Sequence, residues 1–471
     1  MNYSDEFYEF QNSSANNDEI ESRISFCKEI IESGKIYSNL ETLEETIQIC
    51  MERDLPEDGL FLTEALLEIA PYNSELWQLR GVFKNNMMEF EDAYESLLKA
   101  LSLNPSDVET LVNKSIAEDN LGFYEEASKS LNAALTIDPD NEEAHFNLGV
   151  LLEKQEKYEE AIIALRRSIE KDPDFIEAWY ELGYCYENMD DLEPALDAYN
   201  KFLDLDPYSS SGWYNKGIVL IRMGEFEKAA DSFELSLAIR DDFASAWFNC
   251  GVAYANLGRL IDSQKAFKKA SELDPFDEMI WFSLGQTYED TNDYLNAIKC
   301  YNKTLEIDAE NYDAYLERGY CYDAIGKYHL ALKDFNKAIT LTDETPEAWY
   351  AKAELEYSLG KVRDSIKSYK KIVEFHPEDF EAWFKLAEVY IEVGNWLEAI
   401  AAYDKCIDLN PENANPHYGK AKVNFLLRKT QEAINSLKSA FFLDPGIKKK
   451  FAKDYPEIKT SKLFSKLIDE Q

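Results

Sequence analysis

Large rings and amides recur at one register of this sequence, and both kinds of side chain can bind polypeptide. A position that returns every 34 residues, here called the ring column, is occupied by Phe146, Tyr180, Tyr214, Phe248, Phe282, Leu316, Tyr350, Phe384 and Tyr418. The position that follows it is an asparagine in several copies: Asn113, Asn147, Asn215 and Asn249. An amide donates to a carbonyl and accepts from an N–H, so it can contact a peptide main chain without reading its side chains.

Carboxylates stand close to these rings in the sequence, as the repeat that contains Tyr180 shows. If Tyr180 lies on a helix, Tyr184 and Glu187 lie on the same stripe, and Glu181 stands where other copies have asparagine. Rings and carboxylates together favour a ligand that carries lysine or arginine and apolar side chains, through ion pairs and cation–π contacts.

The sequence contains no arrangement typical of catalysis or metal binding. None of its four histidines pairs with another at helical spacing, and no GxGxxG, GxxxxGK[ST] or GxSxG motif occurs. The repeats described below leave no stretch of chain for a catalytic domain. We therefore expect a protein that is not an enzyme, without catalytic residues, metal site or cofactor.

The charge of the chain limits the classes of partner that it can bind, and its cysteine content indicates the compartment. Asp and Glu number 91 against 49 Lys and Arg, and the net charge of −42 repels nucleic acid and anionic lipid. The seven cysteines form no CxxC pair, which fits reduced thiols in a reducing compartment. No signal-peptide pattern or long apolar run occurs. We expect a cytoplasmic protein that binds a protein or peptide, and neither nucleic acid nor a membrane; its oligomeric state stays open.

The elements that position the rings follow from a second column one residue earlier. This Trp column holds Trp77, Leu111, His145, Trp179, Trp213, Trp247, Trp281, Tyr315, Trp349, Trp383 and His417. Small residues recur four and sixteen positions after it, and proline is usual 28 positions after it. Such spacing predicts two amphipathic helices that approach closely, with proline ending the second helix. Each unit is a helical hairpin that cannot bury its apolar faces alone.

The run Trp179-x2-Leu182-Gly183-x2-Tyr186, followed by Ala195-x3-Tyr199 and Pro207, resembles the tetratricopeptide repeat, with tyrosine in place of phenylalanine at 199. The resemblance implies an all-α fold, a right-handed α-solenoid (superhelix) of 34-residue helix-turn-helix units. We predict an acidic, polar segment with a capping helix at 1–42 and an array at 43–450. Within the array, 43–76 is a degenerate repeat and 77–450 holds eleven in-register repeats. A Lys-rich capping helix is predicted at 451–471.

The resemblance also implies that the first helices line a concave groove and that the ring column faces it. The asparagines are similar to the asparagine ladder in the repeat arm of O-GlcNAc transferases, which holds extended peptides. The alternative is that the rings only pack against one another and close the inner wall. We expect a non-catalytic scaffold or adaptor that binds a basic or apolar protein segment in an acidic, aromatic-lined groove. A substrate-targeting subunit of a separate enzyme and a self-assembling scaffold are the alternative functions.

Overall fold

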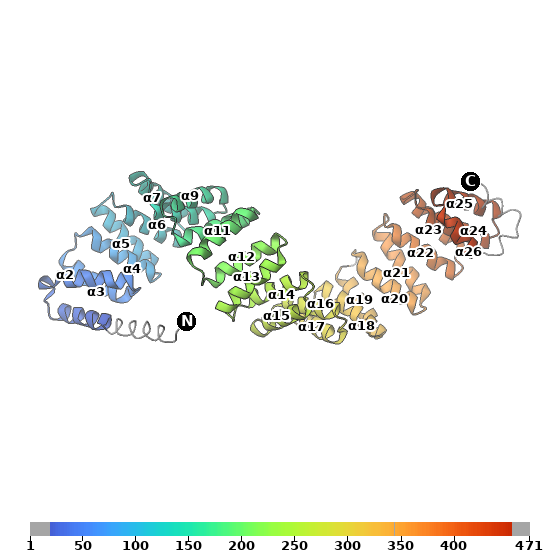
Figure 1. Ribbon diagram of the computed structural model, residues 1–471, viewed down its shortest axis with the longest axis horizontal. Coiled ribbons are helices and arrows are strands. Elements are labelled where there is room, and N and C mark those ends of the chain that lie inside the picture. Colours follow the sequence, from blue (N-terminus) through green and yellow to red (C-terminus); the bar gives the residue numbers. More distant parts are fainter. Residues whose placement is uncertain (1–18, 343, 455–471) are drawn as a thin grey trace. The chain divides into compact units, whose positions relative to one another are not determined.

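The structure is a computed structural model that describes residues 19–342 and 344–454. Within these ranges the chain is helical, with no strand, and consecutive helices pack in pairs (Figure 1). Residues 19–32 are helical and are followed by a 3-10 turn, η1 (Ile36–Ser38), and by the helices α2 (Leu40–Glu52) and α3 (Pro56–Ile69). The chain is thus an all-α array of helical hairpins, as predicted.

Each 34-residue repeat contributes one first helix and one second helix. The first helices are α4 (Ser74–Asn86), α6 (Val108–Asn120), α8 (Glu142–Glu153), α10 (Ile176–Asn188), α12 (Ser210–Arg222), α14 (Ala244–Asn256), α16 (Glu278–Asp290), α18 (Tyr312–Ala324), α20 (Pro346–Ser358), α22 (Phe380–Glu392) and α24 (Ala414–Leu426). The second helices are α5 (Phe90–Leu103), α7 (Tyr124–Ile137), α9 (Tyr158–Lys171), α11 (Leu192–Leu205), α13 (Phe226–Ile239), α15 (Leu260–Leu273), α17 (Tyr294–Ile307), α19 (Tyr328–Leu341), α21 (Val362–Phe375), α23 (Trp396–Leu409) and α25 (Thr430–Leu443). A further helix, α26 (Gly446–Asp454), follows them.

Local sequence signals begin and end these helices. Side chains such as Asn141 cap the first helices, and its Oδ1 accepts the backbone N–H of Ala144 at 2.8 Å. The turn between the two helices of a repeat contains a residue in the left-handed region, for example Gly224 with φ 75° or Asp190 with φ 60°. That conformation ends the first helix and reverses the chain, which explains why glycine recurs at this position.

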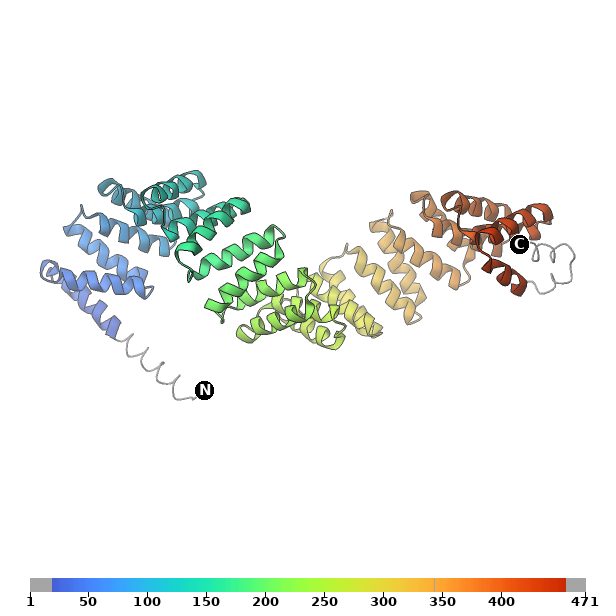
Figure 2. The same cartoon turned by 45° about the horizontal axis from the view of Figure 1, so that its top comes forward.

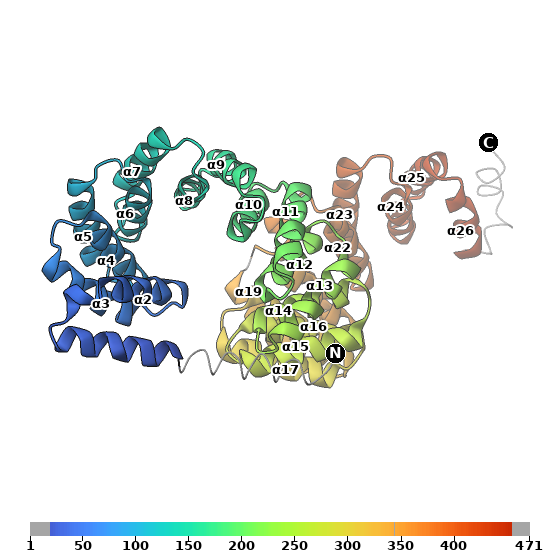
Figure 3. The same ribbon diagram turned by 60° about the vertical axis from the view of Figure 1, so that its left-hand side comes forward.

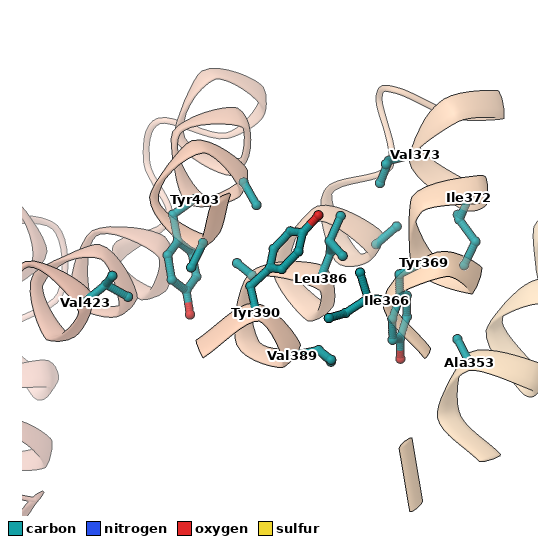
Figure 4. Close-up of a cluster of buried hydrophobic side chains, with 14 residues drawn as sticks. Ala353, Ile366, Tyr369, Ile372, Val373, Leu386, Val389, Tyr390, Tyr403 and Val423 are labelled. Atoms are coloured by element: carbon teal, nitrogen blue, oxygen red, sulfur yellow. The ribbon is translucent and has the colours of Figure 1, made fainter. Parts of the chain in front are cut away.

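The two helices of a repeat approach closely because the first carries a small residue opposite a ring. At Gly183 a Cβ atom would lie 2.8 Å from the Tyr199 ring, and at Gly217 it would lie 2.6 Å from Phe233. Both rings are fully buried. Figure 4 shows a core of this kind in later repeats, where Tyr390 of α22 lies between second-helix side chains that include Tyr369 and Tyr403.

In several repeats the residue of the Trp column bonds to the turn that precedes its helix. The indole N–H of Trp179 donates to the carbonyl of Pro173 at 2.9 Å, and Trp77, Trp213, Trp281 and Trp383 make the same bond to the residue six positions earlier. A ring nitrogen of His145 lies 3.0 Å from the corresponding carbonyl of Pro139. These contacts hold the connecting turn against the next first helix.

The chain divides into two compact units, Met1–Asp241 and Asp242–Gln471. In the first unit, α4, α6, α8 and α10 lie on the inner side of the row of hairpins and α5, α7 and α9 on the outer side (Figure 3). The hairpins of the second unit run from yellow-green to red in Figure 2. In the first unit α4, α6, α8 and α10 contact one another in turn, and in the second unit α18 contacts both α16 and α20, and α22 contacts α24. We call the surface that the first helices form in each unit the first-helix face.

The predicted domain boundaries stay predictions. The helices that lie near these boundaries are described below. The region predicted as a degenerate repeat, 43–76, holds all of α3 and most of α2, which begins three residues earlier at Leu40. The last described helix, α26, begins at Gly446, before the predicted boundary at 451, and residues 1–18 and 455–471 lie outside the described ranges. None of the described helices combines the length and the apolar character needed to cross a membrane.

Candidate functional site

The ring column lies on the first helices and packs against their partner helices. The ring centroids of Tyr180 and Tyr199 are 6.0 Å apart, and the same contact, with a ring nineteen residues later, occurs at 5.8 Å for Tyr214, 5.5 Å for Phe248, 5.6 Å for Phe282, 6.1 Å for Tyr350 and 5.7 Å for Phe384. These six rings are half-buried. Each therefore stabilises its own hairpin and still leaves part of its surface on the first-helix face.

Three members of the column depart from this arrangement. Phe146 is half-buried and packs on Phe175, with ring centroids 4.8 Å apart. Leu316 and Tyr418 are buried, at 6% and 3% exposure. The ring of Tyr418 lies 6.3 Å from that of Phe451 in α26, so Tyr418 does not belong to the accessible part of the column.

The asparagines beside the rings bond mostly within their own helices. The Nδ2 atoms of Asn113, Asn147 and Asn249 donate to the carbonyl four residues earlier, at 3.0, 2.9 and 2.9 Å. The Nδ2 of Asn215 donates to the hydroxyl of Tyr180 in the preceding repeat at 2.9 Å. Each of these bonds uses only one of the two N–H groups of a side-chain amide, so it does not by itself exclude a contact with a bound peptide.

The tyrosines most exposed on the first-helix face stand beside the ring column. Tyr184 is 39% exposed, Tyr320 38% and Tyr357 40%. Sequence reasoning named Tyr184 but missed Tyr320 and Tyr357. Their spacing is the signal that could have identified them, since Tyr320 stands four residues after Leu316 and Tyr357 seven after Tyr350, on the same helical stripe.

Two carboxylates meet where α8 and α10 adjoin. Burial, followed by the negative charge of Glu181, raises the pKa of Glu153 to about 8. Burial also raises the pKa of Glu181. Two like charges at one partly buried site disfavour full ionisation, so the pair can hold a proton near neutral pH. Glu153 was missed in the sequence because acidic residues are too frequent for any pair to stand out.

Glu187, also predicted at the site, is held by the hydroxyl of Tyr199, which donates to its Oε2 at 3.1 Å. Burial raises the pKa of Glu187, whereas the Arg222 guanidinium, 3.6 Å away, lowers it. In the second unit Glu289 accepts a hydrogen bond from Tyr301 in the same way, at 2.8 Å.

The second unit repeats the acidic pair of the first at the same register. Glu289 and Glu317 are 28 residues apart, as are Glu153 and Glu181. Burial, and then the charges of Glu289 and Asp313, raise the pKa of Glu317 to about 7. Both units therefore carry, on the first-helix face, carboxylates whose ionisation is incomplete near neutral pH.

Helices α16 to α22 concentrate carboxylates on this face. Glu381 contacts the Lys385 ammonium at 4.0 Å. Among the residues that the structure describes, no ion pair is formed by Asp290, Asp313, Glu317, Asp323, Glu347, Glu354 or Glu388. This part of the face is therefore strongly negative and lacks internal neutralisation.

The described ranges contain no cluster of three or more histidine, cysteine or acidic side chains that could hold a metal ion. The seven cysteines are all buried, and none forms a disulfide within the described ranges. Burial raises the pKa of thiols such as Cys185 and Cys300 to about 12, which makes them unreactive core groups.

Comparisons with known proteins agree with the repeat geometry. Family models described as tetratricopeptide repeat match residues 142–175, 176–209, 198–230, 244–277, 350–414 and 384–446, and a TPR repeat model matches 120–156. A model for anaphase-promoting complex, cyclosome, subunit 3 matches residues 290–372. A comparison with curated protein sequences gave no match.

Several solved structures are similar in fold. A tetratricopeptide repeat protein from Parabacteroides merdae is 22% identical with TM-score 0.39, covering 53% of this chain and 98% of that one. MamA from Desulfovibrio magneticus is 24% identical with TM-score 0.35, covering 36% of this chain and 96% of that one. YrrB, described as a TPR protein with an unusual peptide-binding site, is 23% identical with TM-score 0.38, covering 40% of this chain and 97% of that one. From its repeated hairpins and the repeat models that match its sequence, the chain belongs to the tetratricopeptide repeat family.

Proposed function

We propose that this protein is a non-catalytic scaffold or adaptor that binds a protein segment carrying lysine or arginine and apolar side chains. The observation that carries the proposal is the set of carboxylates on α16 to α22 that form no ion pair among the described residues and stand beside the exposed rings of Tyr320 and Tyr357. The partner is a protein or peptide, since the net charge of −42 disfavours nucleic acid and anionic membranes.

The physical basis is charge complementarity on an aromatic surface. A cationic side chain gains from ion pairs with carboxylates and from the faces of exposed tyrosines, while apolar side chains cover the half-buried rings. Because these carboxylates are partly exposed, salt should weaken the interaction strongly and should act mainly on the association rate.

A role as the substrate-targeting subunit of a separate enzyme would use the same face. Stoichiometric co-purification of one enzyme would favour that role over a scaffold with several partners. We place the protein in the cytoplasm, on the support of its seven buried thiols, none of which forms a disulfide within the described ranges.

A peptide library displayed on phage and selected against the full-length protein tests the proposal. Selected peptides should be enriched in Lys or Arg next to apolar residues and should lose binding to the Glu354→Lys/Glu388→Lys variant. The matched control is Glu398→Lys/Asp408→Lys on α23, which makes the same change in charge on a second helix. Selection of acidic or uncharged peptides, or equal loss in both variants, would count against binding at this face.

A further inference from the structure

A pocket of about 500 Å³ opens on the first-helix face of the second unit. We call it the acidic hollow. Its floor and wall include Phe267 of α15 and Val252 of α14, and the carboxylates Glu289, Asp290 and Glu317 line it from α16 and α18. All of these residues belong to one compact unit.

The acidic hollow exists because two small residues occupy a junction that larger side chains fill elsewhere. Residues 28 apart meet where neighbouring first helices adjoin: the Nδ2 of Asn85 donates to the carbonyl of Asn113 at 2.9 Å, and Glu153 meets Glu181. The equivalent residues at the hollow are Ala255 and Ser283, and both line it. Their short side chains leave volume open between α14 and α16.

The charges around the acidic hollow are not neutralised within the described chain. Glu289 accepts the Tyr301 hydroxyl, but neither it nor Asp290 or Glu317 forms an ion pair with a described lysine, arginine or histidine. Burial opposes ionisation of Glu289 and Glu317, the two most buried of these groups. A cation in the hollow would remove that penalty, because it favours the ionised form.

We propose that the acidic hollow binds an arginine side chain of the protein segment held on the first-helix face. The planar guanidinium presents five donors, which match carboxylates on two neighbouring helices and the amide oxygen of Gln286, another lining residue. The methylene stem would cover Val252 and Phe267. A lysine ammonium, with three donors on a single nitrogen, would satisfy fewer of these acceptors at once. This assignment rests on the proposed function and specifies one side chain of its ligand.

Ligand-observed NMR with the full-length protein and Nα-acetyl-arginine amide tests the acidic hollow directly. At about pH 8.5, above the pKa of Glu317, the arginine amide should bind more tightly than the lysine amide, and the uncharged citrulline amide should not bind. Ala255→Leu fills the hollow and keeps every charge, while Glu317→Gln keeps the shape and removes one charge. Each should weaken arginine amide binding by at least about tenfold.

Glu310→Gln is the matched control, because it removes one carboxylate that does not line the hollow; it should bind the arginine amide as the wild type does. Thermal melting of each variant checks the fold. Equal binding of citrulline, or wild-type affinity in folded Ala255→Leu or Glu317→Gln, overturns the assignment. If the arginine amide does not bind while the selected peptides still distinguish Glu354→Lys/Glu388→Lys from its control, the hollow assignment fails and the proposed function stands.

Discussion

The indole nitrogen of Trp179 lies 2.9 Å from the carbonyl oxygen of Pro173, across the turn that joins two repeats. The tryptophan thus does more than fill space between helices. It satisfies a carbonyl near the end of the preceding helix and holds the turn to the next one. Because several repeats make the same bond, the Trp column sets the stacking of the array.

Replacing Trp213 by phenylalanine should weaken this link while keeping an aromatic ring. The change removes the 2.9 Å hydrogen bond to Pro207 and should cost about 1 kcal/mol. Hydrogen exchange should become faster at the junction of α11 and α12. Trp396→Phe is the matched control, because the Trp396 Nε1 is buried without a hydrogen-bond partner. A control that loses as much stability as Trp213→Phe would show that the bond contributes nothing.

Gly217→Ala should destabilise its hairpin. The added Cβ would lie 2.6 Å from the buried Phe233 ring, so α12 and α13 must separate or the ring must move. Overpacking of this kind should lower the free energy of unfolding by about 1–3 kcal/mol. Chemical denaturation measures this loss. Other repeats carry Ala353 and Ala387 at this column, opposite Tyr369 and Tyr403, so those helices already accommodate a methyl group. An unchanged denaturation midpoint in Gly217→Ala would contradict the prediction, because it would show that α12 and α13 also accommodate a methyl group.

Replacing Lys114 by methionine should leave a carboxylate buried with a single partner. Glu118 is 1% exposed, contacts the Lys114 ammonium, and accepts the Ser130 hydroxyl at 2.6 Å. Removing one partner of a buried ion pair lowers the free energy of unfolding by about 3–5 kcal/mol. Lys114→Met/Glu118→Met should recover much of this loss, which a double-mutant cycle measures. Additive losses would mean that the two charges do not depend on each other.

The stability of the array should rise as pH falls from about 8.5 toward 6. Glu153 and Glu317 have folded-state pKa values of about 8 and about 7, against 4.5 in the unfolded chain, so the folded protein binds the extra protons. Their contribution is complete below the unfolded pKa and is lost as pH rises through 7 to 8. Thermal melting of Glu153→Gln should show a higher midpoint at pH 8.5 and a smaller dependence on pH.

Lower pH also relieves the general repulsion of an acidic chain, so this prediction needs a matched variant. Glu160→Gln removes one exposed charge from α9 and should keep the full pH dependence. If Glu153→Gln and Glu160→Gln have the same profile, the Glu153–Glu181 pair is not the source of the effect.

The 34-residue register is sufficient to predict the helix pairs, their turns and the buried ring in each hairpin, because each of these depends on spacing within one repeat. The partners of the site residues depend on contacts that spacing does not specify. Tyr180 receives a hydrogen bond from Asn215 of the next repeat, while Asn113 and Asn147 donate to carbonyls of their own helices. The burial of Tyr418 depends on α26, and the acidic hollow on the coincidence of Ala255 and Ser283 in space.

Site-specific photo-crosslinking tests most directly whether the first-helix face of the second unit contacts the partner segment. A benzophenone amino acid at Tyr320 or Tyr357 should crosslink to a peptide selected from the library. The same group at Tyr328, an exposed tyrosine of 44% accessibility on the second helix α19, should not. Crosslinking confined to positions 320 and 357 is the predicted result; equal crosslinking at 328, or none at 320 and 357 from a peptide that binds, would contradict it.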